Sequence, residues 1–204
     1  MQLEQEVWKE YEERDNIGKF ISDILRHSKV GELPLLILGL PGAGKSLLCN
    51  MLAAKILFHE YHVIIIKLRD TIADETINQQ INQQMKRDFS NSCTWDDIAE
   101  SGINKPVLLI FDGYDELLQA SGRTYSDYIK KIAEFQKDQK SIYNIFVKCI
   151  VTSRTTLIDK ALIMDNTPVI RLSDFDAERI DVWSKIWNEN NKIFFQKNQL
   201  DYFE

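Results

Sequence analysis

The sequence is poor in the residues that build disulfide frameworks and zinc sites. Its three cysteines, Cys49, Cys93 and Cys149, include no pair with C-x-x-C spacing. The three histidines form no ligand pattern either: His27, His59 and His62. These absences argue against a disulfide-stabilised or zinc-bound fold. We expect Cys49 and Cys149 to be buried, reduced thiols that pack as small apolar groups.

An excess of basic residues is also missing. The 204 residues include 25 lysines and arginines against 31 acidic residues, which gives a net charge of -6 at pH 7. Proteins that bind nucleic acids hold the phosphate backbone with clustered lysines and arginines. Here the basic residues are scattered, and those between residues 127 and 140 alternate with acidic ones. The sequence therefore does not predict nucleic-acid binding.

Long apolar segments are absent as well. The first eight residues are acidic and lack the apolar core of a signal peptide, and no apolar run approaches the length needed to span a membrane. We therefore expect a cytoplasmic protein without a membrane partner. The length of the chain is sufficient for one principal α/β domain with a core of its own.

What the chain does contain is a phosphate-binding motif. Residues 39–46 fit the P-loop pattern G-x-x-x-x-G-K-[ST] and read Gly39-Leu40-Pro41-Gly42-Ala43-Gly44-Lys45-Ser46. The glycines let backbone N–H groups point at phosphates, Lys45 supplies a positive charge, and the Ser46 hydroxyl can bind Mg²⁺. We therefore predict nucleotide contacts from residues 39–46 and from the next residue, Leu47. The alternative is a glycine-rich turn with a solvated lysine.

The segments around this loop predict the fold class. Apolar runs indicate five strands, at residues 33–38, 62–68, 107–111, 145–151 and 168–172. Apolar residues at helical spacing indicate helices around residues 17–25, 47–57, 74–89 and 125–135. This alternation predicts an α/β fold, a three-layer αβα sandwich of the P-loop NTPase type with a mainly parallel five-stranded sheet. Its ligand cleft is expected at the carboxyl edge of the sheet.

Two of the predicted helical segments carry unusual composition. The first holds a tandem Ile-Asn-Gln-Gln repeat, for which we predict one buried stripe and a solvated face, with a partner surface as the alternative. The stripe comprises Ile77, Ile81, Met85 and Phe89. The second lies near the C-terminus and is rich in large apolar residues that need a cover. They are Ile180, Trp183, Ile186, Trp187, Phe194, Phe195, Leu200, Tyr202 and Phe203.

These features predict three regions. We expect an N-terminal helical leader at residues 1–30, a P-loop NTPase core at residues 31–175 and the start of a helical subdomain at residues 176–204. Ser173 or Asp174 is the predicted cap of the helix in the last region. The uncovered apolar residues there lead us to expect a fragment of a longer protein, with a further domain packed on this surface.

A second chemical motif follows the third predicted strand. Asp112 ends that strand and is predicted to bind Mg²⁺ together with Ser46. Glu116 could orient the attacking water, and Asp115 is a second catalytic candidate. Both acidic residues could instead simply favour a helix N-terminus. Arg154, after the fourth strand, could stabilise charge on the γ-phosphate, and a surface salt bridge is its alternative role.

Together these residues resemble a known family. Residues 39–46, the run Leu109-Ile110-Phe111-Asp112-Gly113-Tyr114-Asp115-Glu116-Leu117 and the turn Thr152-Ser153-Arg154 are similar to the NACHT domain of the STAND class of signalling NTPases. The glycine after the aspartate and the acidic pair beyond it carry most of this resemblance. Residues 172–175 are similar to the segment that leads into the helical domain of that family.

The resemblance implies a slow ATPase that acts as a switch. ATP or ADP would bind with Mg²⁺, and nucleotide exchange would allow homo-oligomerisation and signalling by attached effector domains. Many bacterial members act in defence against phage. The winged-helix and sensor domains of the family would be partners supplied by a longer protein.

Other readings of the P-loop remain open. A small-molecule kinase would need a lid of basic residues, and no arginine cluster follows the third strand. A Ras-like GTPase would need an N-K-x-D motif, which the sequence lacks, so adenine is the predicted base. A replicative or transport ATPase and a non-hydrolysing interaction module stabilised by nucleotide are the further alternatives.

Overall fold

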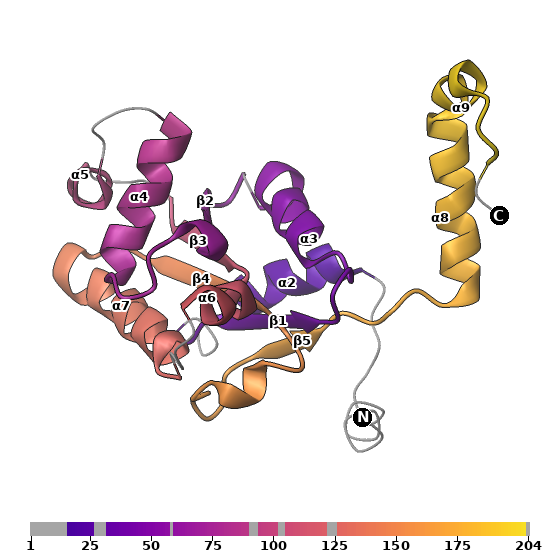
Figure 1. Ribbon diagram of the computed structural model, residues 1–204. Helices are drawn as coiled ribbons and strands as arrows, with labels where there is room; N and C mark the ends of the chain where they lie inside the picture. The colour runs from indigo at the N-terminus through magenta and orange to yellow at the C-terminus, as the bar shows by residue number, and fades with distance from the viewer. Residues whose placement is uncertain are drawn as a thin grey trace. The chain divides into compact units, whose positions relative to one another are not determined.

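The computed structural model describes residues 16–26, 32–57, 59–89, 94–101, 105–121 and 126–202 (Figure 1). His27, Cys93, Phe203 and the first fifteen residues of the predicted leader lie outside these ranges. The chain divides into two compact units, Met1–Leu172 and Ser173–Glu204. Among the described residues, no helix is both long enough and apolar enough to cross a membrane.

A five-stranded sheet forms the centre of the first unit. Its strands are β1 (Leu35–Gly39), β2 (His62–Lys67), β3 (Val107–Asp112), β4 (Val147–Arg154) and β5 (Val169–Arg171). Neighbouring strands are parallel throughout, in the order β2-β3-β4-β1-β5. The predicted α/β fold of the P-loop NTPase type is therefore confirmed. The order places β4 between β1 and β3, an arrangement that the sequence did not predict.

Helices cover both faces of the sheet, because successive side chains of a strand point to opposite sides. Leu35 and Ile37 of β1 pack with one set of helices, and Leu36 and Leu38 pack on the opposite face. The first set comprises α2 (Ile17–Arg26), α3 (Lys45–Met51) and the π-helical turn η1 (Leu52–Ile56). The second comprises α4 (Ile77–Phe89), α5 (Trp95–Glu100), α6 (Tyr114–Ser121) and α7 (Tyr128–Tyr143), as Figure 1 shows.

Two expectations about burial in this unit were wrong. The strand predicted as buried at residues 62–68 is β2 at the edge of the sheet, where Val63, Ile64 and Ile65 are only half-buried. An edge strand has a neighbour on one side only, so its side chains are covered less. In the helix after the P-loop, Leu47 is 65% exposed and Met51 is 44% exposed. These two residues lie four positions apart on one face of α3, and it is the face with Cys49 that packs against the sheet.

The Ile-Asn-Gln-Gln repeat forms α4, in which three of the four residues of the predicted stripe are buried, as expected. The buried face is wider than predicted and ends before the fourth. Phe89 is 63% exposed, whereas Gln80 and Gln84 are buried. Gln80 Oε1 accepts a hydrogen bond from Tyr128 Oη of α7 at 2.5 Å. Gln84 Oε1 accepts one from the backbone N–H of Lys67 at 3.3 Å. The prediction of a solvated face was therefore wrong for these two glutamines, since α7 and β2 cover them.

In the second unit, the described residues 173–202 form the helices α8 (Ala177–Asn190) and α9 (Lys192–Asn198). Asp176 caps α8, with its side chain accepting the N–H of Arg179 at 2.8 Å. The predicted cap at Ser173 or Asp174 was wrong, because the chain between Arg171 and Ala177 is irregular. Trp183 and Trp187 stack with ring centroids 5.3 Å apart and are 45% and 43% exposed.

Candidate functional site

The P-loop motif forms the turn from β1 into α3. Gly42 and Gly44 have φ angles of 83° and 84°, in the left-handed region that favours glycine. Gly44 immediately precedes the first helical residue, Lys45. The two glycines are therefore required by the shape of the turn, as the sequence motif implies.

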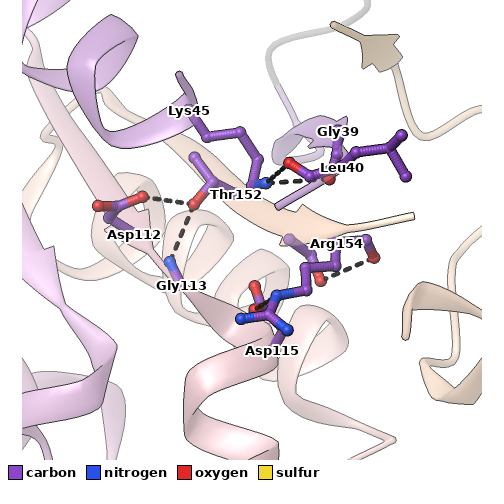
Figure 2. A network of polar contacts seen from close by, with 9 residues as sticks. Gly39, Leu40, Lys45, Asp112, Gly113, Asp115, Thr152 and Arg154 are labelled. Atoms are coloured by element: carbon purple, nitrogen blue, oxygen red, sulfur yellow. Dashed lines mark hydrogen bonds and ion pairs between the residues drawn. The ribbon is translucent and has the colours of Figure 1, made fainter. Parts of the chain in front are cut away.

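Lys45 points back across its own loop. Its Nζ donates hydrogen bonds to the carbonyl oxygens of Gly39 at 2.9 Å and Leu40 at 3.0 Å (Figure 2). Burial is the main cause that lowers the pKa of Lys45, while the negative charge of Asp115 opposes this shift and Arg154 adds to it. A nearby anion would attract the ammonium and so offset the cost of burying its charge. The position of Lys45 therefore favours a phosphate.

A buried hydroxyl joins the ends of β3 and β4. Thr152 Oγ1 donates a hydrogen bond to Asp112 Oδ1 at 2.6 Å and accepts one from the N–H of Gly113 at 2.9 Å (Figure 2). Thr152 is completely buried. Gly113 has a φ of 90°, which starts the turn into α6. One side chain thus holds both the carboxylate at the end of β3 and the turn after it.

Cys49 of α3 lies near the same carboxylate oxygen. Its Sγ is 3.9 Å from Asp112 Oδ1, a distance at which a thiol is a weak donor. Cys49 and Cys149 are free and buried, as predicted. Burial raises the pKa of both thiols, so they stay protonated at neutral pH.

Arg154 and Asp115 form an ion pair at the mouth of the site. Arg154 Nε lies 2.8 Å from Asp115 Oδ2, and the side chains are 35% and 5% exposed (Figure 2). Arg154 is the last residue of β4 and stands in register with Gly39 of β1. Asp115 lies in the first turn of α6. The pair therefore links the centre of the sheet to α6.

Glu116 lies beside this pair in the same turn of α6. Its backbone N–H donates to the carbonyl oxygen of Gly113 at 2.9 Å. A Cβ added at Gly113 would lie 3.1 Å from Glu116 Oε2, so the carboxyl group folds back over the turn. The turn itself therefore positions this carboxylate.

One cavity of about 310 Å³ collects these groups at the carboxyl ends of β1, β3 and β4. It is lined by Pro41, Gly42, Gly44, Lys45, Ser46, Leu47, Asp112, Gly113, Asp115, Glu116, Thr152 and Arg154. Of the predicted site residues, Gly39, Leu40 and Ala43 do not line it, although the first two bind Lys45 through their carbonyl groups.

Thr152 and Gly113 line the cavity but were not among the predicted site residues. Thr152 was placed in a turn after the fourth strand, whereas β4 continues to Arg154. In a strand, residues two apart share a face, so an extended β4 brings Thr152 and Arg154 to the same side. That alternation is the signal that could have identified Thr152.

The lining of the cavity fits a nucleotide with a divalent cation. Its charged side chains are two cations, Lys45 and Arg154, and three carboxylates, Asp112, Asp115 and Glu116. A polyanion next to this excess of negative charge requires a further cation. The Ser46 hydroxyl and the Asp112 carboxylate are the hard oxygen ligands that Mg²⁺ prefers.

The protein alone supplies few ligands for such a cation. Among the described residues, no group of three or more His, Cys, Asp and Glu side chains is arranged to hold a metal. Mg²⁺ commonly binds through one or two protein groups together with phosphate oxygens and water. The residues present therefore suit a metal that arrives with a nucleotide.

A known protein family matches most of the chain. Residues 35–172 match the ATPase family associated with various cellular activities (AAA). No curated protein matches the chain in sequence. Among solved structures, the chain is similar to C. elegans PCH-2, with a TM-score of 0.48 and 15% identity, over 88% of this chain and 47% of that one. The chain thus spans about half the length of that protein.

Proposed function

The chain belongs to the AAA family of ATPases, and from that premise we propose that it binds Mg²⁺ and ATP in the 310 Å³ cavity and hydrolyses the nucleotide slowly. The observation that carries this proposal is the convergence of Lys45, Arg154, Asp112 and Glu116 on one cavity beside the P-loop. These groups come from three different parts of the chain. A ligand that contacts all of them would account for their position around one cavity.

In this proposal the loop at residues 39–47 binds the phosphates. Its backbone N–H groups would face the phosphate oxygens, and Lys45 would exchange the carbonyl oxygens of Gly39 and Leu40 for the β and γ phosphates. Ser46 and Asp112 would hold Mg²⁺, which when bound offsets negative charge on the phosphates. ADP would occupy the same loop with fewer contacts.

Hydrolysis in this proposal depends on Glu116 and Arg154. Glu116 is the carboxylate that would orient the attacking water. Asp115 is 3% exposed and paired with Arg154, so we assign it the role of holding that arginine rather than that of a base. Arg154 would shift from Asp115 toward the γ-phosphate when ATP binds.

We extend the proposal to a signalling switch of the STAND class. Three features support it: Gly113 after Asp112, the acidic pair at Asp115 and Glu116, and Arg154 at the end of β4. In this reading residues 31–175 are the NTPase core, residues 176–204 begin a helical subdomain, and a longer protein supplies winged-helix and sensor domains. ATP binding would then promote homo-oligomerisation in the cytoplasm, in bacterial defence.

The test compares Lys45→Ala and Glu116→Gln with the wild type, using a fluorescent ATP analogue for binding and phosphate release for turnover. We expect Lys45→Ala to lose at least about tenfold in ATP affinity, since it removes the charge that faces the phosphates. Glu116→Gln should bind ATP normally and hydrolyse it about 100-fold more slowly. Lys55→Ala removes an exposed lysine of η1 and is the matched control.

Three outcomes would contradict the proposal at different points. Normal ATP affinity in Lys45→Ala would refute the phosphate role of the loop. Normal turnover in Glu116→Gln would refute the role of Glu116. For the switch, we expect Glu116→Gln to form larger species with ATP than with ADP in light scattering, and equal sizes would refute it.

A further inference from the structure

We propose that the Thr152 hydroxyl is the positioning group of the Asp112 carboxylate and sets which carboxylate oxygen faces a divalent cation. The inference rests on the proposed binding of Mg²⁺ with a nucleotide. It concerns a residue of β4 that belongs neither to the P-loop nor to the predicted metal ligands.

The hydrogen bonds around Thr152 have only one possible direction. The backbone N–H of Gly113 can only donate, so Thr152 Oγ1 must accept from it, at 2.9 Å. The single hydroxyl proton is then free for Asp112 Oδ1, 2.6 Å away. This short distance is typical of a hydroxyl that donates to an ionised carboxylate. Oδ1 is therefore an acceptor toward Thr152, which leaves Oδ2 as the oxygen for a cation.

The position of the hydroxyl is itself fixed by the sheet. Thr152 is completely buried in β4, between β1 and β3. A β-branched side chain has restricted rotation about χ1, and the two hydrogen bonds of the hydroxyl favour the rotamer seen here. Asp112 Oδ1 also has Cys49 Sγ at 3.9 Å. The carboxylate is thus held by its neighbours before it acts as a ligand.

The same hydroxyl is also linked, through the backbone of Gly113, to Glu116, the proposed water-orienting residue. It binds the N–H of Gly113, and the carbonyl oxygen of Gly113 accepts the N–H of Glu116 at 2.9 Å. Thr152 therefore couples the orientation of Asp112 to the turn that carries Glu116. Because Thr152 already orients the Asp112 carboxylate, binding of a cation would not have to restrict the motion of that side chain. Loss of a residue that orients a metal ligand typically weakens metal binding.

The test is a Mg²⁺ titration of nucleotide binding in three variants, with a fluorescent ATP analogue as the probe. Thr152→Val keeps the shape of the side chain and removes the hydroxyl, whereas Thr152→Ser keeps the hydroxyl. Ser153→Ala is the matched control, because Ser153 is equally buried in β4 and its Oγ lies 3.4 Å from the carbonyl oxygen of Arg154.

We expect Thr152→Val to need at least ~10-fold more Mg²⁺ for half-maximal binding, with unchanged affinity for the analogue in EDTA. Thr152→Ser and Ser153→Ala should stay within about twofold of the wild type. A positioning role also predicts a lower kcat in Thr152→Val at saturating Mg²⁺ and ATP. Equal losses with Mg²⁺ and with EDTA would mean a general structural defect and would overturn the inference.

Hydrogen exchange supplies a readout that needs neither nucleotide nor turnover. The Gly113 amide should be protected in the wild type and in Thr152→Ser, and should exchange faster in Thr152→Val. If Thr152→Val does not fold, hydrogen exchange of the wild type still tests the inference. An unprotected Gly113 amide in the wild type would overturn it.

The titration also separates this inference from the proposed function. A wild type that binds the analogue equally well with Mg²⁺ and with EDTA would refute the Mg²⁺-dependent function itself. A wild type that depends on Mg²⁺, together with a Thr152→Val variant that matches it, would overturn the role of Thr152 alone.

Discussion

At the scale of single residues, four of the charged side chains of the cavity have protein partners. Lys45 binds two carbonyl groups, Arg154 binds Asp115, and Asp112 accepts from Thr152. Such contacts fix each side chain in place and reduce the entropy that a ligand must remove. The contacts of Lys45 and Arg154 can also be exchanged, because phosphate oxygens are the same kind of acceptor as the carbonyl and carboxylate oxygens they would replace.

The ion pair between Arg154 and Asp115 gives a prediction about stability. Arg154→Ala would leave the buried Asp115 carboxylate without its partner, and we expect the free energy of unfolding to fall by about 2 kcal/mol. In an Asp115→Asn background the same change should cost less than half as much, since no charge is left unpaired. Urea unfolding of the four proteins measures this difference, and additive effects would show that the pair is not coupled.

At the scale of elements, the turn from β3 into α6 decides where the acidic pair goes. Gly113 takes a left-handed conformation, and Tyr114 and Leu117 are buried three positions apart on α6. These two anchors orient the helix, so that the residues between them line the cavity. The dipole at the start of α6 favours the same two carboxylates, so both roles weighed for Asp115 and Glu116 are compatible.

Two glycines with similar φ angles make a matched test of this turn. Gly113→Ala would place a Cβ 3.1 Å from Glu116 Oε2, whereas Gly42→Ala meets nothing within 4 Å. We expect Gly113→Ala to lower the free energy of unfolding by about 2 kcal/mol and Gly42→Ala by about 1 kcal/mol. Gly113→Ala should also reduce ATP turnover by displacing Glu116. Equal stability losses in denaturant titrations would argue against the close contact.

At the scale of the whole molecule, ionisable groups are part of the core of the first unit. Tyr114, Tyr128, Cys49 and Cys149 are all at most 2% exposed. Burial raises the pKa of Tyr114 to about 12 and that of Tyr128 well above its ordinary value of 10.0. It also raises the pKa of both thiols above 9.0. Folding therefore keeps these four groups neutral in alkaline solution.

This burial predicts that stability falls at high pH. Above about pH 9 the thiols, and above about pH 10 the tyrosines, lose protons in the unfolded chain but keep them in the fold. The folded state then binds more protons, so the free energy of unfolding decreases with pH, by up to about 1.4 kcal/mol per pH unit for each group. Below about pH 9 this contribution is fully present.

Urea unfolding between pH 7 and pH 11 measures this decline. Tyr114→Phe removes one of the four groups, and its stability should fall less steeply than that of the wild type from pH 10 upward. A stability that does not change over this range would contradict the prediction, as would equal slopes in the two proteins.

The sequence by itself determined the local features of this protein. The P-loop turn, the apolar strands and the acidic residues after β3 could all be predicted, because residue type and spacing control backbone conformation over short distances. The parallel αβα architecture followed from the alternation of such elements. Even there, the sequence analysis missed η1 after Met51 and the cap at Asp176, although the contact of that cap, with the N–H of Arg179, is local.

The tertiary structure alone decided which residues meet. It placed β4 between β1 and β3, which brought Thr152 to Asp112 and Arg154 to Asp115. It also buried Gln80 against Tyr128, where the sequence predicted a solvated face. The order of strands and the partners of a polar side chain depend on the packing of segments far apart in the chain. Short-range patterns of apolar and polar residues do not predict that packing.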